Sequence, residues 1–168
     1  SNAIFFLVSA VVILFFLSLG YWIAKIVESA VKLVFKQVKL EEKIKQRGLD
    51  KSLAGFSVTQ ITVVFLKLYI VFAFLGAASD IINISFFTQV ILGILAYLPS
   101  FFQGIVLIVG ILFVAAYVTN TIRKQRDLIF SQQIASFLEL LILYVGIILA
   151  LPLFLPNLKD QIVVLEKL

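Results

Sequence analysis

The chain has 168 residues, of which 62% are hydrophobic and 14% are charged, and its mean hydropathy is +1.16. Because so few polar residues cannot cover the surface of a soluble globule, the composition predicts an integral membrane protein. The sequence has no cysteine and no histidine, which excludes disulfides, thiol chemistry and imidazole sites. Its net charge of +5 comes mainly from two segments beside apolar runs, a pattern typical of membrane topology rather than of nucleic-acid binding.

The first apolar run covers residues 4–24. Residues 1–3 resemble the remnant of a cleaved tag, so we expect native sequence to begin at Ile4. A run of this length forms a helix of about 30 Å, which is enough to cross a bilayer core. Tyr21 and Trp22 lie near its end, where aromatic residues favour the membrane interface. We therefore predict a first membrane span over 4–24.

Lysines recur at close to helical spacing in the next segment, with aliphatic residues between them. This pattern predicts a basic amphipathic helix over 25–47 that continues the first span. One helix from Ile4 to Gln46 is about 65 Å long, so it either projects from the membrane or bends onto its surface. A solvated basic face and specific contact with anionic lipids both remain open. The candidate lipid contacts are Lys25, Lys32, Lys36, Lys39 and Lys43.

A second span is predicted over 58–79. Gly48 is placed to end the basic helix, and Ser57 with Gln60 three residues later forms a capping box that begins the next helix. Lys67 lies inside this span, where an isolated charge costs about 2.5 to 3.5 kcal/mol on insertion scales. Its ammonium group therefore either reaches the lipid headgroups or pairs with a carboxylate inside the helix bundle.

Pro99 divides the following apolar sequence. A helix over 86–97 is only about 18 Å long, so we predict an interfacial or re-entrant half-helix that ends at the proline. Ser100 with Gln103 forms another capping box and predicts a third span over 100–122. This run contains no charged residue before Arg123.

A fourth span is predicted over 131–155 and carries Glu139. Pro152 lies near the end of this span, and residues 158–168 form a short mixed tail segment.

The spans suggest a parallel internal duplication. An offset of 72 residues takes Lys67 to Glu139, and an offset of 90 takes Gly20 to Gly110. The two charged residues then lie at equal depth, so we predict that they form an intramembrane ion pair. The predicted repeats cover 4–92 and 93–168.

The fold class is therefore an all-α integral membrane protein with four transmembrane helices and short half-helices. Basic residues crowd the connectors after the first and third spans, and none lies between Ser79 and Phe101. The positive-inside rule then predicts a multi-pass protein of the cell membrane with both termini outside.

Several of these segments resemble a known family. Residues 20–25, the basic helix, Arg47-Gly48-Leu49-Asp50, the run from Leu92 to Pro99, Gly104 and Gly110 are similar to the conserved transmembrane-helix repeat of small proteins grouped with the small-conductance mechanosensitive channels. The second copy has Ile111 and Leu112 where an aromatic residue is expected. The sequence also lacks the cytoplasmic β-rich domain of the true small-conductance channels. The resemblance implies a role in ion conduction or in sensing membrane tension.

Two functions follow from the sequence. The first is a tension-responsive homo-oligomeric ion channel, with the small-residue helix from Ser100 to Ala116 near the ion path or at subunit contacts. The alternative is a non-conducting scaffold or anionic-lipid-binding module. The sequence contains no pattern of catalytic, metal-binding or cofactor-binding residues, so we do not expect an enzyme. The expected partners are membrane lipids, further copies of the chain and, for a channel, ions. The candidate packing, pore or hinge positions are Gly20, Gly93, Ala96, Pro99, Gly104, Gly110 and Ala115.

Overall fold

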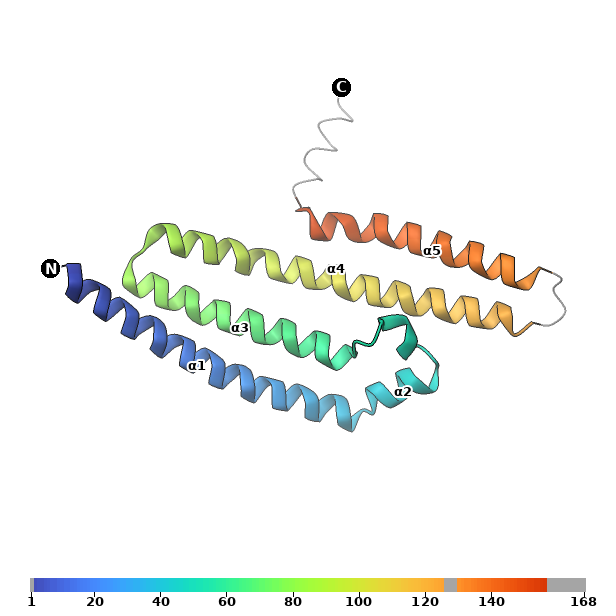
Figure 1. Ribbon diagram of the computed structural model, residues 1–168, viewed down its shortest axis with the longest axis horizontal. Helices are drawn as coiled ribbons and strands as arrows, with labels where there is room; N and C mark the ends of the chain where they lie inside the picture. The colour runs from blue at the N-terminus through green and yellow to red at the C-terminus, as the bar shows by residue number, and fades with distance from the viewer. Residues whose placement is uncertain (1, 126–129, 157–168) are drawn as a thin grey trace, which may run out of the picture. The chain divides into compact units, whose positions relative to one another are not determined.

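The computed structural model describes residues 2–125 and 130–156, and these residues contain helices and turns but no strand. The predicted tail segment over 158–168 lies outside the described residues. Within the described residues, four helices are long and apolar enough to cross a membrane, which confirms the all-α class and agrees with the predicted number of spans. The elements are α1 (Asn2–Gln37), α2 (Leu40–Gln46), the short 3-10 helix η1 (Asp50–Leu53), α3 (Val58–Ile82), α4 (Ser85–Arg123) and α5 (Ser131–Phe154) (Figure 1).

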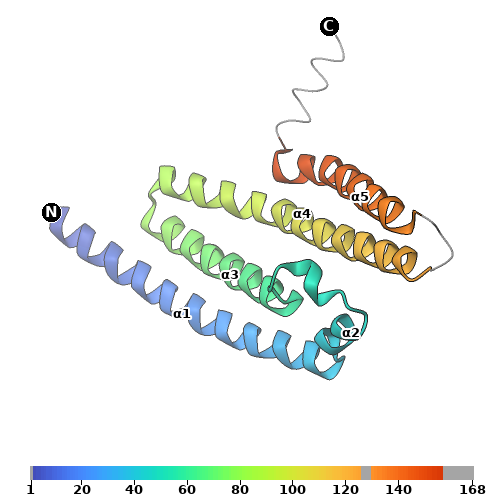
Figure 2. The same cartoon turned by 45° about the vertical axis from the view of Figure 1, so that its right-hand side comes forward.

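The chain forms two compact units. The first unit contains α1, α3 and the part of α4 up to Pro99, with α1 and α3 side by side in opposite directions (Figures 1 and 2). Gly20 lets the two helices approach, because a Cβ atom at this position would lie only 3.0 Å from the Phe74 Cβ. Ala24 and Ala78 are fully buried. Small residues at such contacts are typical of helices that pack closely in lipid.

The second unit contains residues 44–55, the rest of α4 and α5. Here the contacts again place a glycine against a large side chain. The Phe154 ring lies 2.8 Å from the position of a Cβ at Gly104, and Ile111 lies 2.5 Å from the position of a Cβ at Gly146. These contacts set the register of the antiparallel α4 and α5 helices (Figure 1).

The predicted break at Pro99 is wrong. Helix α4 runs without interruption for 39 residues, so the half-helix over 86–97 is its first part and the capping box at Ser100 does not form at a helix start. Proline removes one backbone donor from a helix interior, but its fixed φ is compatible with helical geometry. In membrane helices, neighbouring groups compensate for the lost hydrogen bond, which makes an internal proline tolerable.

The predicted helix from Ile4 to Gln46 is interrupted by a bend, so it is not one continuous helix. Helix α1 ends at Gln37, and Lys39 adopts a left-handed conformation with φ of 54° before α2 begins. No glycine or proline marks this position, so the bend has no local sequence signal. Two residues after the bend, the Glu41 carboxylate accepts hydrogen bonds from Thr59 in α3.

Other helix ends follow their sequence signals. Gln60 donates its backbone N–H to the Ser57 hydroxyl at 3.0 Å, and Ser57 donates its backbone N–H to the Gln60 side chain at 3.2 Å, which confirms the capping box. Gly48 has φ of 67° and ends α2 as predicted. Two backbone hydrogen bonds of a Schellman motif close this end, from Gly48 to Lys45 and from Leu49 to Ile44.

Candidate functional site

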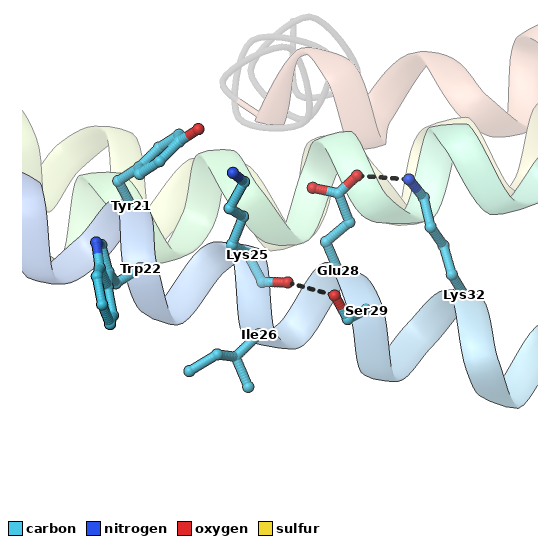
Figure 3. A pocket seen from close by; sticks show the side chains of 7 residues that line it. All are labelled: Tyr21, Trp22, Lys25, Ile26, Glu28, Ser29 and Lys32. Carbon is cyan, nitrogen blue, oxygen red and sulfur yellow. Dashed lines mark hydrogen bonds and ion pairs between the residues drawn. The ribbon is translucent and has the colours of Figure 1, made fainter.

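The α1 basic groove is an open depression of about 540 Å³ at the end of the first apolar run. All of its lining residues come from α1, so the regular spacing of one helix positions them. The groove is lined by Tyr21, Trp22, Lys25, Ile26, Glu28, Ser29 and Lys32 (Figure 3).

A polar stripe and an apolar stripe meet in this groove. Figure 3 shows Tyr21, Lys25 and Glu28 pointing to one side of α1 and Trp22 and Ile26 pointing to the other. The Trp22 and Ile26 side chains are 70% and 65% exposed. Exposed apolar and aromatic side chains beside ammonium groups match the boundary between hydrocarbon and headgroups, where each kind of group finds a suitable environment.

Glu28 joins two lysines from different helices. The Lys32 Nζ atom donates to Glu28 Oε1 at 2.6 Å, and the Lys67 Nζ atom donates to Glu28 Oε2 at 2.8 Å. The Glu28 side chain is 20% exposed, whereas that of Lys67 is 36% exposed. The helix register explains this contact, since Glu28 follows Gly20 by eight residues and Lys67 precedes Phe74 by seven. The antiparallel packing of Gly20 on Phe74 therefore brings the two charges together.

Lys25 has a different environment. Its ammonium group lies 5.4 Å from the centre of the Tyr21 ring, a cation–π contact worth about 0.5 to 1 kcal/mol at an exposed site. Within residues 2–125 and 130–156 no carboxylate pairs with Lys25. The Glu28 carboxylate is shared by Lys32 and Lys67, and Lys25 adds a third ammonium group on the same helix as Glu28, so the local charge is positive. The arrangement can bind an anionic group of a ligand or lipid.

The predicted ion pair between Lys67 and Glu139 joins residues of the two units and stays a prediction, and within its own unit each side chain has another partner. Lys67 bonds to Glu28, and Glu139 lies 3.9 Å from Arg123. The side chains of Arg123 and Glu139 are 48% and 41% exposed, so this second pair contributes little to stability. In each unit the charged residue of the second helix thus pairs with a residue of the helix that precedes it.

The other predicted lipid contacts lie beyond the groove. Lys36 occupies the last turn of α1. Lys39 lies at the bend, with its Nζ atom 4.0 Å from Glu42, and Lys43 lies in α2. Of the five candidate lysines, the groove thus contains Lys25 and Lys32.

The predicted packing, pore or hinge positions have different environments. Gly20 and Gly104 face large side chains in their own units, and Ala115 is 3% exposed. In contrast, a Cβ atom at Gly93 or Gly110 would meet no heavy atom within 4 Å. The remaining two positions, Ala96 and Pro99, are exposed on α4.

The sequence analysis missed the role of Glu41. Its Oε1 atom accepts hydrogen bonds from the Thr59 backbone N–H at 2.9 Å and from the Thr59 hydroxyl at 2.8 Å. Thr59 lies in the first turn of α3, where backbone N–H groups lack partners inside the helix and a carboxylate is favourable. No sequence signal identifies this contact, because the two residues lie in different elements and meet only after the chain bends at Lys39.

No group of three or more acidic side chains that could hold a metal ion occurs in the described part of the chain. Comparison with protein-family models, with curated proteins and with solved structures finds no match for this sequence or its fold.

Proposed function

We propose that the chain is a multi-pass membrane protein that binds anionic lipid headgroups at the inner leaflet through the α1 basic groove. The observation that carries this proposal is the position of the groove. Lys25 and Lys32 lie directly after the apolar run, on a helix that also exposes Trp22 and Ile26. A basic residue near an anionic leaflet contributes about 1 kcal/mol to binding, and Trp favours the same depth.

Lipid retention measured by native mass spectrometry tests this function. The wild-type protein should retain phosphatidylglycerol over zwitterionic phosphatidylcholine. Replacing two groove lysines, Lys25→Gln with Lys32→Gln, should weaken that preference about tenfold or more, since two lysine contributions are lost. Lys51→Gln is the matched control, because it removes an exposed charge in η1 outside the groove. Equal retention of both lipids by the wild type, or an equal effect of Lys51→Gln, would overturn the proposal.

The proposed topology places both termini outside the cell and the basic connectors inside. Lysines are concentrated in the segment after the first apolar run, and the positive-inside rule places such a segment on the cytoplasmic side. The chain has no native cysteine, so single cysteines can be introduced without background labelling. Cysteines at Ser52 and Asn83 should react with impermeant reagents from opposite sides of sealed vesicles. Labelling of both from one side contradicts this topology.

A parallel duplication is part of the proposal. In the first unit, Gly20 contacts Phe74. Adding 90 residues to Gly20 and 72 residues to Phe74 gives positions 110 and 146, so the duplication predicts a contact between these two positions in the second unit. In the second unit, Gly146 packs against Ile111, one residue from Gly110. The agreement in helix register supports a common origin of the two hairpins, with glycine on the first helix in one hairpin and on the second helix in the other.

A tension-responsive oligomeric channel of the mechanosensitive type is the second candidate function. Gly110 favours it, because this glycine opens onto an apolar groove of about 570 Å³ between α4 and α5 in the second unit. Small residues without a partner in their own chain suit helix contacts between subunits in lipid. Gly104 is less suited to that role, since its surface already holds the Phe154 ring.

Recording from reconstituted protein under controlled tension tests the channel. Gly110→Leu should change the oligomeric state or the tension threshold, because a large side chain there fills the open surface. Val114→Ala, a change at an exposed position in the same groove, tests whether the effect is specific to the glycine. Patches that stay silent up to rupture, together with a monomer in nanodiscs, would exclude this function.

A further inference from the structure

The bend between α1 and α2 is not explained by its local sequence. Residues 36–43 contain neither glycine nor proline. Lys39 nevertheless has φ of 54°, a left-handed conformation that an L-residue adopts only when surrounding contacts enforce it. Both helices have regular backbone bonds up to this position, with Val38 bonded to Val34 at 3.0 Å and Lys43 to Lys39 at 3.0 Å. The strain is therefore concentrated at one residue.

The enforcing contact lies two residues after the bend. Glu41 accepts two hydrogen bonds from Thr59, and its carboxylate lies at the N-terminal end of α3. The Ser57 hydroxyl accepts the next backbone N–H, from Gln60. Glu41 and Ser57 together thus satisfy two N–H groups that have no partner inside α3.

We propose that residues 38–40 form a two-state hinge, in which the bond between Glu41 and Thr59 holds α2 in the bent form and its release lets α1 continue as one helix through Gln46. The straight form relieves the left-handed conformation of Lys39, and water replaces Glu41 at Thr59. The bent form keeps the carboxylate cap and the strain. Each form thus has one favourable term that the other lacks, as a bistable element requires.

Chain length permits the straight form. Helix α1 extended from Gln37 to Gln46 grows by nine residues, or about 13 Å. Residues 47–57 connect this end back to α3 and can span up to about 36 Å when extended. The connector is therefore long enough for the helix to straighten while α1 and α3 remain packed.

Straightening changes the surface that the lysines present. Residues 32, 36, 39 and 43 are separated by four, three and four positions, so on one continuous helix they form a single stripe. The bend interrupts this stripe after Lys36. An anionic membrane surface therefore favours the straight form, an effect that rests on the proposed lipid-binding function.

Distance measurements between two spin labels test the hinge. Cysteines at Ala30 and Gln46, both exposed and separated by sixteen residues, would lie about 24 Å apart along a continuous helix. The wild type in phosphatidylcholine nanodiscs should give a shorter distance. Glu41→Gln should increase the population near the continuous-helix distance about tenfold or more, the factor expected for loss of a charge-assisted hydrogen bond.

Two controls separate the hinge from a general loss of structure. Glu42→Gln removes the neighbouring carboxylate, whose side chain is 66% exposed and makes a 4.0 Å contact with Lys39, and should leave the distance unchanged. Lys39→Gly should favour the bent form and oppose Glu41→Gln. If Glu41→Gln gives the wild-type distance in both neutral and phosphatidylglycerol nanodiscs, the hinge is refuted.

Repeating the distance measurement in nanodiscs of different lipids distinguishes the hinge from the proposed lipid-binding function. Phosphatidylglycerol should increase the long-distance population of the wild type. If Glu41→Gln straightens the helix but phosphatidylglycerol has no effect on either protein, the hinge stands and its lipid control is refuted. If native mass spectrometry also shows no lipid preference, the proposed function fails separately from the hinge.

Discussion

Gly146 and Gly110 lie within neighbouring helices of the second unit, yet an added methyl group meets opposite conditions at the two positions. At Gly146, a Cβ atom would lie 2.5 Å from the Ile111 Cγ2 atom and 2.6 Å from its Cδ1 atom. At Gly110, no heavy atom lies within 4 Å. Ile111 cannot easily rotate away, because β-branched side chains in helices are restricted to one main χ1 rotamer. We therefore expect Gly146→Ala and Gly110→Ala to have different effects on stability.

The magnitude follows from two terms. Replacing glycine by alanine within a helix stabilises it by about 0.8 to 1 kcal/mol, and this term applies to both variants. Forcing an extra carbon into a packed contact costs about 1 to 3 kcal/mol, and this term applies at Gly146 alone. Gly110→Ala should then raise the free energy of unfolding by up to about 1 kcal/mol. Gly146→Ala should be less stable than Gly110→Ala by about 1 to 3 kcal/mol.

Unfolding in mixed micelles, followed by circular dichroism or steric trapping, measures this difference. A double-mutant cycle with Ile111→Ala identifies its cause, because removal of the contacting atoms should relieve the cost of Gly146→Ala. Coupling of about 0.5 to 3 kcal/mol is expected for residues in direct contact. If Gly146→Ala is as stable as Gly110→Ala, or if the cycle shows no coupling, the register of α4 and α5 described here is incorrect.

Further substitutions test individual contacts. Glu28→Gln should lower the midpoint of unfolding only slightly, since Lys67 is more than one third exposed and solvent screens the pair. Adding Lys67→Leu should recover the loss, and a further decrease would contradict the pairing. Thr119→Val should leave stability equal or higher, because the buried Thr119 hydroxyl lacks a hydrogen-bond partner in the described structure. Thr62→Val, whose hydroxyl bonds to the backbone at 2.9 Å, should instead lower the midpoint of unfolding. Lys39→Gly should stabilise the protein by up to about 1 kcal/mol if the bend persists, whereas in a continuous helix it should destabilise by a similar amount.

The four long apolar helices and most of their ends could be predicted because the information is local. An apolar run of sufficient length predicts a membrane helix without knowledge of its neighbours. Ser57 and Gln60 lie within one turn, and their reciprocal hydrogen bonds depend only on residues that are close in sequence. Gly48 adopts positive φ for the same local reason. At Ser57, Gln60 and Gly48, residues that are close in sequence were therefore sufficient to predict where the helices begin and end.

Pro99 and Lys39 show where local signals fail. Pro99 predicts a break, but one missing donor does not outweigh the remaining hydrogen bonds of a long apolar helix. At Lys39 the sequence favours continuation, but two hydrogen bonds to Glu41 from α3 hold the chain in a bend. In one case a tertiary environment tolerates a helix breaker, and in the other a tertiary contact interrupts a good helix.

The ionic contacts depend on helix register, which a single sequence does not specify. Glu28 meets Lys67 only because Gly20 accepts Phe74 at the right distance along the same two helices. In the second unit, the order of the charges is reversed, with Arg123 on the first helix and Glu139 on the second. The glycine also lies on the first helix in one unit and on the second helix in the other. Each contact therefore requires one small and one large side chain, or one positive and one negative charge, and the identity of a residue does not indicate which helix carries its partner.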